Sequence, residues 1–288
     1  MSLKLFYFLL ILFPVLVFSE NRPDISPDEI DTFGDMCPKK EALEGKSGKF
    51  GHTVVLVDTT ESLSNAQSAL LDRIVFDKAI LKKIPPYDRL SILNLTGNDI
   101  QASETKFIFS KCRPRNGDIQ SAYDLDKPSF WVPEKRLKRN WNLFLDDLDK
   151  AKDSLFTQKK GSFTQLMEML KELSRLPDLQ FDDSYETRKL IIVSDFLQFS
   201  DNVNFRASCV NGNKCVTWEK LKEKKSLKNW LETSSPDFGS YYPDVEIIYL
   251  NSKFDPKLNI GLLELWDGYF EDIGISSIKK EAETSTNF

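Results

Sequence analysis

Three oxygen-bearing side chains follow an apolar run within residues 51–64, each two positions from the next. The run 53–57 reads Thr-Val-Val-Leu-Val and leads to Asp58, after which come Thr60 and Ser62. One carboxylate and two hydroxyls from a single short loop suit a hard divalent cation such as Mg²⁺, Mn²⁺ or Ca²⁺. The same residue types also form turns and helix N-caps, which is the structural alternative.

Two later stretches carry similar side chains. Thr164 lies in a loop that precedes a helical pattern over 165–176. Residues 189–195 form a second buried-strand pattern, in which the apolar run 190–193 leads to Ser194 and Asp195. Apolar runs of this length suit strands buried on both faces of a parallel sheet. Open α/β folds place their ligand sites at the carboxyl ends of such strands.

With these residues in this order, the chain resembles a von Willebrand factor A-type (VWA) domain. That family's metal-ion-dependent adhesion site combines D-x-S-x-S with a distant Thr and a distant Asp, on three separate loops. The resemblance implies a doubly wound fold with an antiparallel edge strand, and recognition of an acidic side chain on a protein partner. The cation ligands that it implies are Asp58, Thr60, Ser62, Thr164 and Asp195.

The sequence departs from the family pattern at two positions. Thr60 stands where the family has Ser, which keeps the hydroxyl and adds a methyl group. Ser194, Asp195 and Phe196 stand where the family has T-D-G, so the glycine that lets the backbone turn freely is absent. The resemblance extends over about 51–274, most of the chain that follows the N-terminal apolar segment.

Hydrophobic periodicity predicts the elements that would position these residues. We expect strands at about 52–57, 89–95, 106–110, 189–195 and 245–250. We expect helices at about 64–84, 134–156, 165–176, 216–232 and 262–270. This alternation predicts an α/β domain with a doubly wound, mostly parallel sheet, one antiparallel edge strand and helices on both faces.

The N-terminal residues 1–19 have the pattern of a secretory signal peptide. Lys4 precedes the apolar run 5–18, and cleavage is expected after Ser19. An uncleaved membrane anchor is the alternative, but about 14 apolar residues interrupted by Pro14 are short for a bilayer span of roughly 20. We expect a secreted or periplasmic protein. Beyond the signal, we divide the chain into an irregular arm (20–50), a VWA-like domain (51–275) and a disordered polar tail (276–288).

The four cysteines all follow this segment, and an even number in an exported chain favours disulfides. Cys209 and Cys215 flank an Asn-Gly turn signal, so we pair them, which leaves Cys37 with Cys112. Unpaired buried thiols are an alternative. A zinc site is poorly supported, because the spacings are not of the C-x₂-C kind.

Composition and absent motifs exclude several functions. Of the 288 residues, 41% are hydrophobic and 29% are charged, which is the composition of a folded globular chain. The net charge of −5 argues against general nucleic-acid binding. The sequence contains neither a phosphate-binding P-loop nor a G-x-G-x-x-G fingerprint, so nucleotide binding has no support. The single histidine, His52, begins the first predicted strand and is interpreted as structural, so we predict no hydrolase of the Ser-His-Asp type.

We therefore predict an exported, non-enzymatic VWA-like module that binds a protein partner through Mg²⁺, Mn²⁺ or Ca²⁺. One alternative is a non-catalytic scaffold subunit of an envelope or surface assembly, with an empty metal site. A weaker alternative is a metal-dependent phosphohydrolase of the haloacid dehalogenase class. That class requires D-x-D, and Thr60 replaces the second carboxylate, which would act as the general acid.

Overall fold

The structure of the chain is a computed structural model. The structure describes residues 22–61, 63–95, 107–120, 124–157, 163–176, 185–210, 214–239, 242–250, 256–275 and 278–282. The predicted signal segment, 1–19, lies outside the described residues, as does Ser62. Within the described part of the chain, no helix is both long and apolar enough to cross a bilayer.

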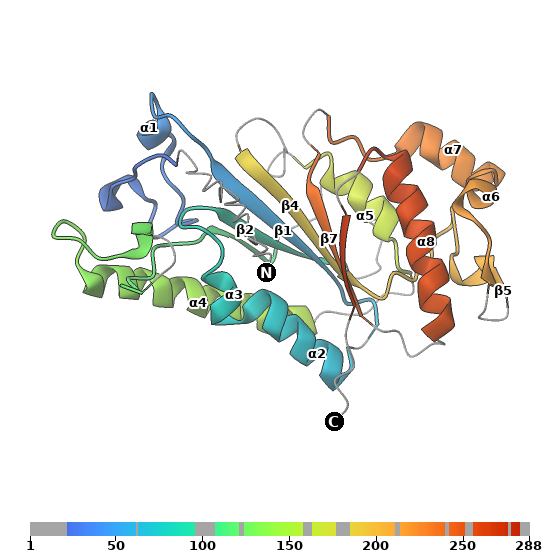
Figure 1. The fold of residues 1–288 in the computed structure, drawn as a ribbon, viewed down its shortest axis with the longest axis horizontal. Helices are drawn as coiled ribbons and strands as arrows, with labels where there is room; N and C mark the ends of the chain where they lie inside the picture. The colour runs from blue at the N-terminus through green and yellow to red at the C-terminus, as the bar shows by residue number, and fades with distance from the viewer. Residues whose placement is uncertain are drawn as a thin grey trace, which may run out of the picture.

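A six-stranded sheet forms the centre of the molecule, in the order β3-β2-β1-β4-β7-β8 (Figure 1). The pairs that join β2, β1, β4, β7 and β8 are parallel, and β3 is an antiparallel edge strand beside β2. This confirms the predicted fold class. The strands are β1 (Phe50–Asp58), β2 (Arg89–Leu95), β3 (Phe109–Cys112), β4 (Tyr185–Ser194), β7 (Asp244–Tyr249) and β8 (Ile278–Ala282). A separate two-stranded ribbon consists of β5 (Cys209–Val210) and β6 (Lys214–Cys215).

Helices cover both faces of the sheet, with α2, α3 and α4 on one side and α5 to α8 on the other (Figure 1). The α-helices are α1 (Lys40–Leu43), α2 (Asn65–Leu71), α3 (Lys78–Leu81), α4 (Glu134–Thr157), α5 (Leu166–Leu173), α6 (Trp218–Lys222), α7 (Lys225–Ser234) and α8 (Pro256–Asp272). A π-helical turn, η2 (Asp72–Phe76), follows α2, and short 3-10 turns are η1 (Pro27–Glu29), η3 (Asp124–Asp126) and η5 (Arg206–Ser208).

Alternate residues of β1 point into two separate cores. Val54 and Leu56 pack with α5 to α8, whereas Val55 and Val57 pack with α2 to α4. A strand buried on both faces needs apolar side chains at successive positions, and that is why the run 53–57 is continuous rather than alternating.

Two predicted helices are each divided in the structure. The pattern over 64–84 becomes α2, the η2 turn and α3, because Asp77 leaves the helical conformation and its carboxylate accepts a hydrogen bond from the backbone N–H of Ala79. The pattern over 216–232 becomes α6 and α7, with a break at Lys224. Apolar periodicity continued through both breaks, so it did not reveal them.

The prediction of a disordered tail over 276–288 is wrong for residues 278–282. They form β8, which pairs in parallel with β7 at the edge of the sheet. Composition was misleading here, because a strand at a sheet edge tolerates lysine and glutamate and gains its order from backbone pairing. The remainder of this segment lies outside the described residues.

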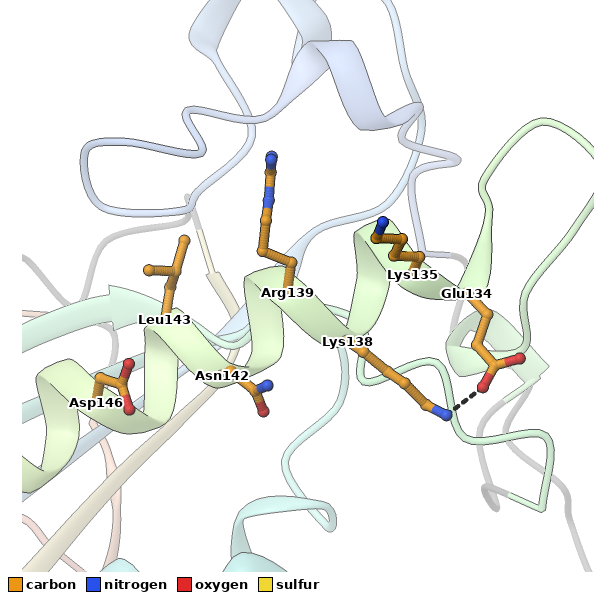
Figure 2. Close-up of a pocket in the computed structure, with 7 residues that line it drawn as sticks. All are labelled: Glu134, Lys135, Lys138, Arg139, Asn142, Leu143 and Asp146. Carbon is orange, nitrogen blue, oxygen red and sulfur yellow. Dashed lines mark hydrogen bonds and ion pairs between the residues drawn. The ribbon is translucent and has the colours of Figure 1, made fainter.

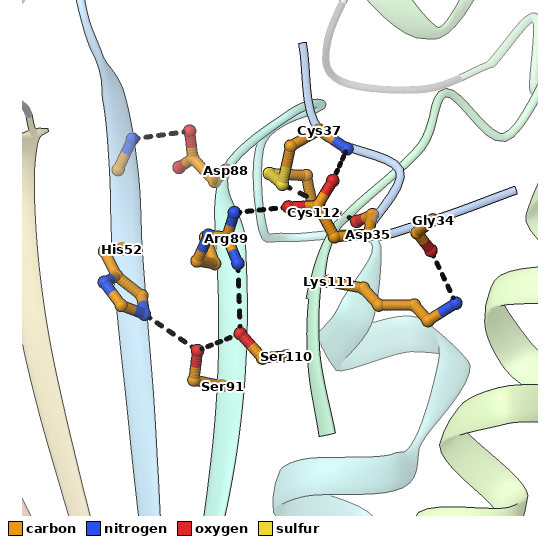
Figure 3. The surroundings of a disulfide bond; sticks show 11 residues. Gly34, Asp35, Cys37, His52, Asp88, Arg89, Ser91, Ser110, Lys111 and Cys112 are labelled. Atoms are coloured by element: carbon orange, nitrogen blue, oxygen red, sulfur yellow. Dashed lines mark hydrogen bonds and ion pairs between the residues drawn. A yellow bond between two sulfur atoms is a disulfide. The ribbon is translucent and has the colours of Figure 1, made fainter. Parts of the chain in front are cut away.

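Both predicted disulfides are present, Cys37–Cys112 and Cys209–Cys215. Figure 3 shows the first, which ties the N-terminal arm to the end of β3. Around it, the Asp35 carboxylate accepts a hydrogen bond from Arg89 at 2.6 Å, and the Asp35 carbonyl accepts one from the backbone N–H of Cys112 at 2.8 Å. The arm is therefore held against β2 and β3 by a covalent bond and by charged hydrogen bonds.

His52 has the structural role that the sequence predicted. Its ring is buried, and its Nε2 lies 2.9 Å from Ser91 Oγ (Figure 3). The ring also packs against Tyr185. Burial, assisted by the positive charge of Arg89, lowers the pKa of His52 to about 3. The imidazole is therefore neutral in the folded protein at neutral pH.

We predict that this histidine contributes to acid instability. Because its pKa is about 3 when folded and about 6.5 when unfolded, the unfolded chain binds the proton first as the pH falls. The stabilisation is complete above about pH 6.5 and declines by up to about 1.4 kcal/mol per pH unit between about pH 6.5 and about pH 3. His52→Gln should flatten the pH dependence of the urea-unfolding free energy over this interval. Parallel profiles for the two proteins would contradict the assignment.

Candidate functional site

The candidate site lies where β1 and β4 end side by side. In the sheet, β1 has β2 on one side and β4 on the other. The chain therefore first adds strands on the β2 side and then, from β4 onward, on the opposite side, so the direction of strand addition reverses between β1 and β4. Such a switch point leaves a crevice at the carboxyl ends of the strands, because the connections leave in opposite directions. Val57 pairs with Val193, which places Asp58 beside Ser194.

Asp58 is buried and is held by hydrogen bonds to both carboxylate oxygens. Thr60 donates to Oδ1 through its backbone N–H at 3.0 Å and through its hydroxyl at 2.7 Å. The Ser194 hydroxyl donates to Oδ2 at 2.7 Å. Burial raises the pKa of Asp58, while the hydrogen bonds from Ser194 and Thr60 oppose that shift.

Thr164 brings a second loop into the site. Its Oγ1 lies 3.0 Å from the Oγ1 of Thr60, although the two residues are 104 positions apart in the sequence. A backbone bridge fixes the loop, since the N–H of Phe199 donates to the Thr164 carbonyl at 2.8 Å. The loops that follow β1 and β4 and the loop that precedes α5 therefore meet here.

Asp195 supplies a second carboxylate. Its Oδ1 accepts a hydrogen bond from the backbone N–H of Leu197 at 3.0 Å. Burial first, and then the negative charge of Asp58, raise the pKa of Asp195 to about 7. Two buried carboxylates, of which one raises the pKa of the other, form a place where a bound cation would be stabilised.

The structure thus brings together four of the five predicted ligands, and the fifth, Ser62, lies outside the described residues. The donor set consists of two carboxylates and two hydroxyls, which are hard oxygen ligands of the kind that Mg²⁺ and Ca²⁺ prefer. Among the residues that the structure describes, no group of three or more His, Cys, Asp or Glu side chains is placed to hold a metal ion. The candidate site therefore depends on hydroxyl oxygens as well as on carboxylates.

Sequence reasoning missed two features of the site. Ser194 was noted only as a departure from the family pattern, although it orients Asp58; a hydroxyl directly before a strand-terminal Asp was the available signal. Phe163 and Phe199 stack with ring centroids 5.2 Å apart beside Thr164, and they are 36% and 41% exposed. No spacing signal links these two rings, which belong to different loops.

The turn after Asp195 keeps the backbone conformation that glycine would allow, even though Phe occupies the position. Phe196 has a φ of 60°, in the left-handed region that disfavours residues with a Cβ. Its ring is fully buried, stacked on Tyr249 and edge-on to Trp266. Its N–H donates to Ser194 Oγ at 2.8 Å, and its carbonyl accepts from Trp266 Nε1 at 2.9 Å. Packing and hydrogen bonds hold this strained residue in place.

Comparisons with known proteins concern the fold. No protein-family model matches the sequence, and no curated protein matches it. Among solved structures, manganese-loaded TRAP protein of Plasmodium vivax is 11% identical, with 74% of this chain and 62% of that chain covered and a TM-score of 0.29. A D319A mutant of the PilB minor pilin from Streptococcus sanguinis is 11% identical, with 84% of this chain and 59% of that chain covered and a TM-score of 0.44. A von Willebrand factor type A protein from Catenulispora acidiphila is 12% identical, with 79% of this chain and 43% of that chain covered and a TM-score of 0.33.

This chain spans less than two thirds of the length of each of these three structures. The chain has a VWA-like fold, with a parallel sheet, one antiparallel edge strand beside β2, and helices on both faces.

We predict an unusual order of stability for substitutions at Phe196. Phe196→Ala should cost about 4 kcal/mol, as is usual for loss of a buried ring. Phe196→Gly should cost about 1 kcal/mol less than Phe196→Ala, because glycine relieves the left-handed backbone strain. Urea unfolding of both variants measures the difference.

Phe205 is the matched control, because it is also fully buried against Trp266 and its φ is not positive. At position 205, the glycine variant should be no more stable than the alanine variant. If the alanine variant were also the more stable one at position 196, the strain assigned to the turn would be absent.

Proposed function

We propose that this protein is an exported, non-enzymatic module that binds a protein partner through a divalent cation, Mg²⁺ or else Mn²⁺ or Ca²⁺. The observation that carries the proposal is the convergence of Asp58, Thr60, Thr164 and Asp195 from three loops at the carboxyl ends of β1 and β4. Oxygen ligands from separate loops suit a hard cation, and the partner is expected to complete its coordination.

Each residue would have a defined part in holding the ion. Asp58 and Asp195 would supply negative charge, directly or through water, and Ser194 would keep the Asp58 carboxylate oriented. The Thr60 hydroxyl donates its hydrogen to Asp58, so its lone pairs are free of that hydrogen. The Thr164 hydroxyl faces Thr60 at 3.0 Å and could turn its hydrogen away to present a lone pair to the ion. Ser62 is proposed as a further hydroxyl ligand of the same loop. The bound cation would attract an anionic group of the partner.

The partner is proposed to offer an acidic side chain with an apolar neighbour. The two carboxylates and the hydroxyls would leave the coordination of the cation incomplete, and an Asp or Glu carboxylate of the partner can occupy an open position. The stacked rings of Phe163 and Phe199 are partly exposed beside Thr164 and offer an apolar contact next to the metal. Aromatic side chains in such positions often dominate binding energy.

Export is proposed from the disulfides and from the signal-like segment. The bonds Cys37–Cys112 and Cys209–Cys215 persist in oxidising compartments and are rare in the cytosol. Residues 1–19 would direct the chain there as a cleaved signal peptide. A secreted or periplasmic location follows from both features.

One observation favours the scaffold alternative, in which the site holds no metal. Both oxygens of Asp58 already accept hydrogen bonds from the protein, so this carboxylate is satisfied without a cation. The two proposals differ in one measurable property, which is the affinity of the metal-stripped protein for a divalent cation.

We predict saturable one-site binding of Mg²⁺ to the metal-stripped protein, measured by isothermal titration. Asp58→Ala and Asp195→Ala should abolish it, because each removes a charged ligand. Ser194→Ala should weaken it about tenfold, since loss of a group that orients a ligand typically costs that much. Asp201→Ala, which removes an exposed carboxylate from the loop after β4, should leave the affinity unchanged. Absence of binding by the folded protein would favour the scaffold.

We also predict the chemistry of the partner's contact sequence. Random peptides selected on the protein in Mg²⁺ and released by a chelator should be enriched in Asp or Glu beside an apolar residue. Phe199→Ser should retain Mg²⁺ affinity, because the Phe199 ring is proposed to contact the apolar residue of the peptide and not the ion. The selected peptides should then lose their enrichment in that apolar residue. Tyr242→Ser, another exposed aromatic change, should retain both. Selection of peptides without acidic residues would contradict the metal-bridged mode.

A further inference from the structure

Two aromatic side chains stand almost fully exposed at a tight turn before α4. Phe130 is 89% exposed and Trp131 is 83% exposed, and their rings contact edge to face with centroids 5.2 Å apart. The backbones of Ser129 and Val132 hydrogen-bond to each other in both directions, at 3.2 and 3.1 Å, which closes the turn beneath the two rings. Val132 is buried, so the turn is anchored to the body of the protein.

The helix that follows this turn is basic at its amino end. Residues 134–139 contain four basic side chains and one acidic one, whereas 146–153 contain four acidic and two basic ones. This order opposes the helix dipole, which favours acidic residues at the start and basic residues at the end. Helix stability therefore does not explain the charge pattern of α4.

Three of these four basic side chains, Lys135, Lys138 and Arg139, line an open hollow on the outer surface of α4. It has a volume of about 710 Å³ and is lined by Glu134, Lys135, Lys138, Arg139, Asn142, Leu143 and Asp146. Figure 2 shows Lys135 and Arg139 projecting from the same side of the helix, one turn apart. Lys138 is paired with Glu134. Two cations one helical turn apart repel each other, so this arrangement would be stabilised by an external anion.

We propose that the turn 129–132 and the basic start of α4 form a surface that binds an anionic lipid bilayer. Phe130 and Trp131 enter the interface at the level of the headgroups, where aromatic rings are favoured. Lys135 and Arg139 contact the lipid phosphates, and basic side chains near an anionic surface attract it strongly. The protein is thus held peripherally, through residues that are separate from the candidate metal site.

The geometry favours a bilayer over a protein partner. A stable protein interface buries about 800 Å² on each side, and two adjacent rings on a closed turn offer only part of that area. A bilayer requires shallow insertion of apolar side chains with cationic groups beside them, and both are present here. The charge of the surface also selects anionic over zwitterionic lipid.

The test uses the mature protein with vesicles of phosphatidylcholine, alone or mixed with phosphatidylglycerol. The wild type should sediment with the mixed vesicles, and raised salt should weaken this binding. The double substitution Phe130→Ser and Trp131→Ser should reduce partitioning by at least about tenfold, because the inserting rings are lost. The double substitution Lys135→Gln and Arg139→Gln should reduce binding to the mixed vesicles by roughly tenfold or more and abolish the difference between the two vesicle types.

Tryptophan fluorescence reports the depth of Trp131 directly. Of the five tryptophans, Trp131 is 83% exposed and the other four are buried, so iodide quenching follows this one residue. Mixed vesicles should shift its emission to the blue and shield it from iodide. Tyr242→Ser removes an exposed aromatic ring elsewhere and should behave as the wild type. If Trp131 remains equally accessible with vesicles, or if the serine variant sediments like the wild type, the proposal is overturned and a protein partner becomes the better explanation.

Discussion

The parallel pairing of β1 with β4 is the constraint on which the rest of the structure depends. Each of these strands is buried on both faces, so the pairing register determines which side chains enter each of the two cores. A shift by one residue would exchange the faces of Val54 and Val55 and would unpack both layers of helices. The same register sets Asp58 beside Ser194, so the core and the site are fixed by a single set of backbone hydrogen bonds.

The site is also where the chain departs from its local preferences. Phe196 adopts a left-handed backbone conformation. Burial raises the pKa of Asp58, and burial together with the negative charge of Asp58 raises the pKa of Asp195. Strain of either kind persists only where the surroundings over-determine the conformation. Here the stacked ring of Tyr249 and the hydrogen bond from Trp266 hold the turn, so the packing of α8 and β7 supports the loop that presents Asp195.

Much of the fold could be predicted because the informative signals are local and repeated. The apolar runs before Asp58 and Ser194 identified the central strands. The Asn-Gly sequence signal between Cys209 and Cys215 identified one disulfide and, by elimination, the other. The remainder depends on contacts that leave no local pattern. β8 gains its order from pairing with β7. The Phe163–Phe199 stack joins two loops that meet only after the sheet has formed.

The two proposed surfaces lie at opposite ends of the sheet. Val132, which anchors the aromatic turn, lines a small cavity with Tyr87. Tyr87 lies two residues before the start of β2 and packs on Phe50 at the start of β1. The candidate metal site lies at the other end of β1, which at about 3.3 Å per residue is roughly 25 Å away. A molecule held at a bilayer by the aromatic turn would therefore present the metal site away from the membrane. Because the two groups of residues share no side chain, lipid binding and metal binding can be lost separately, and a variant that lost both would instead indicate damage to the β1–β4 pairing between them.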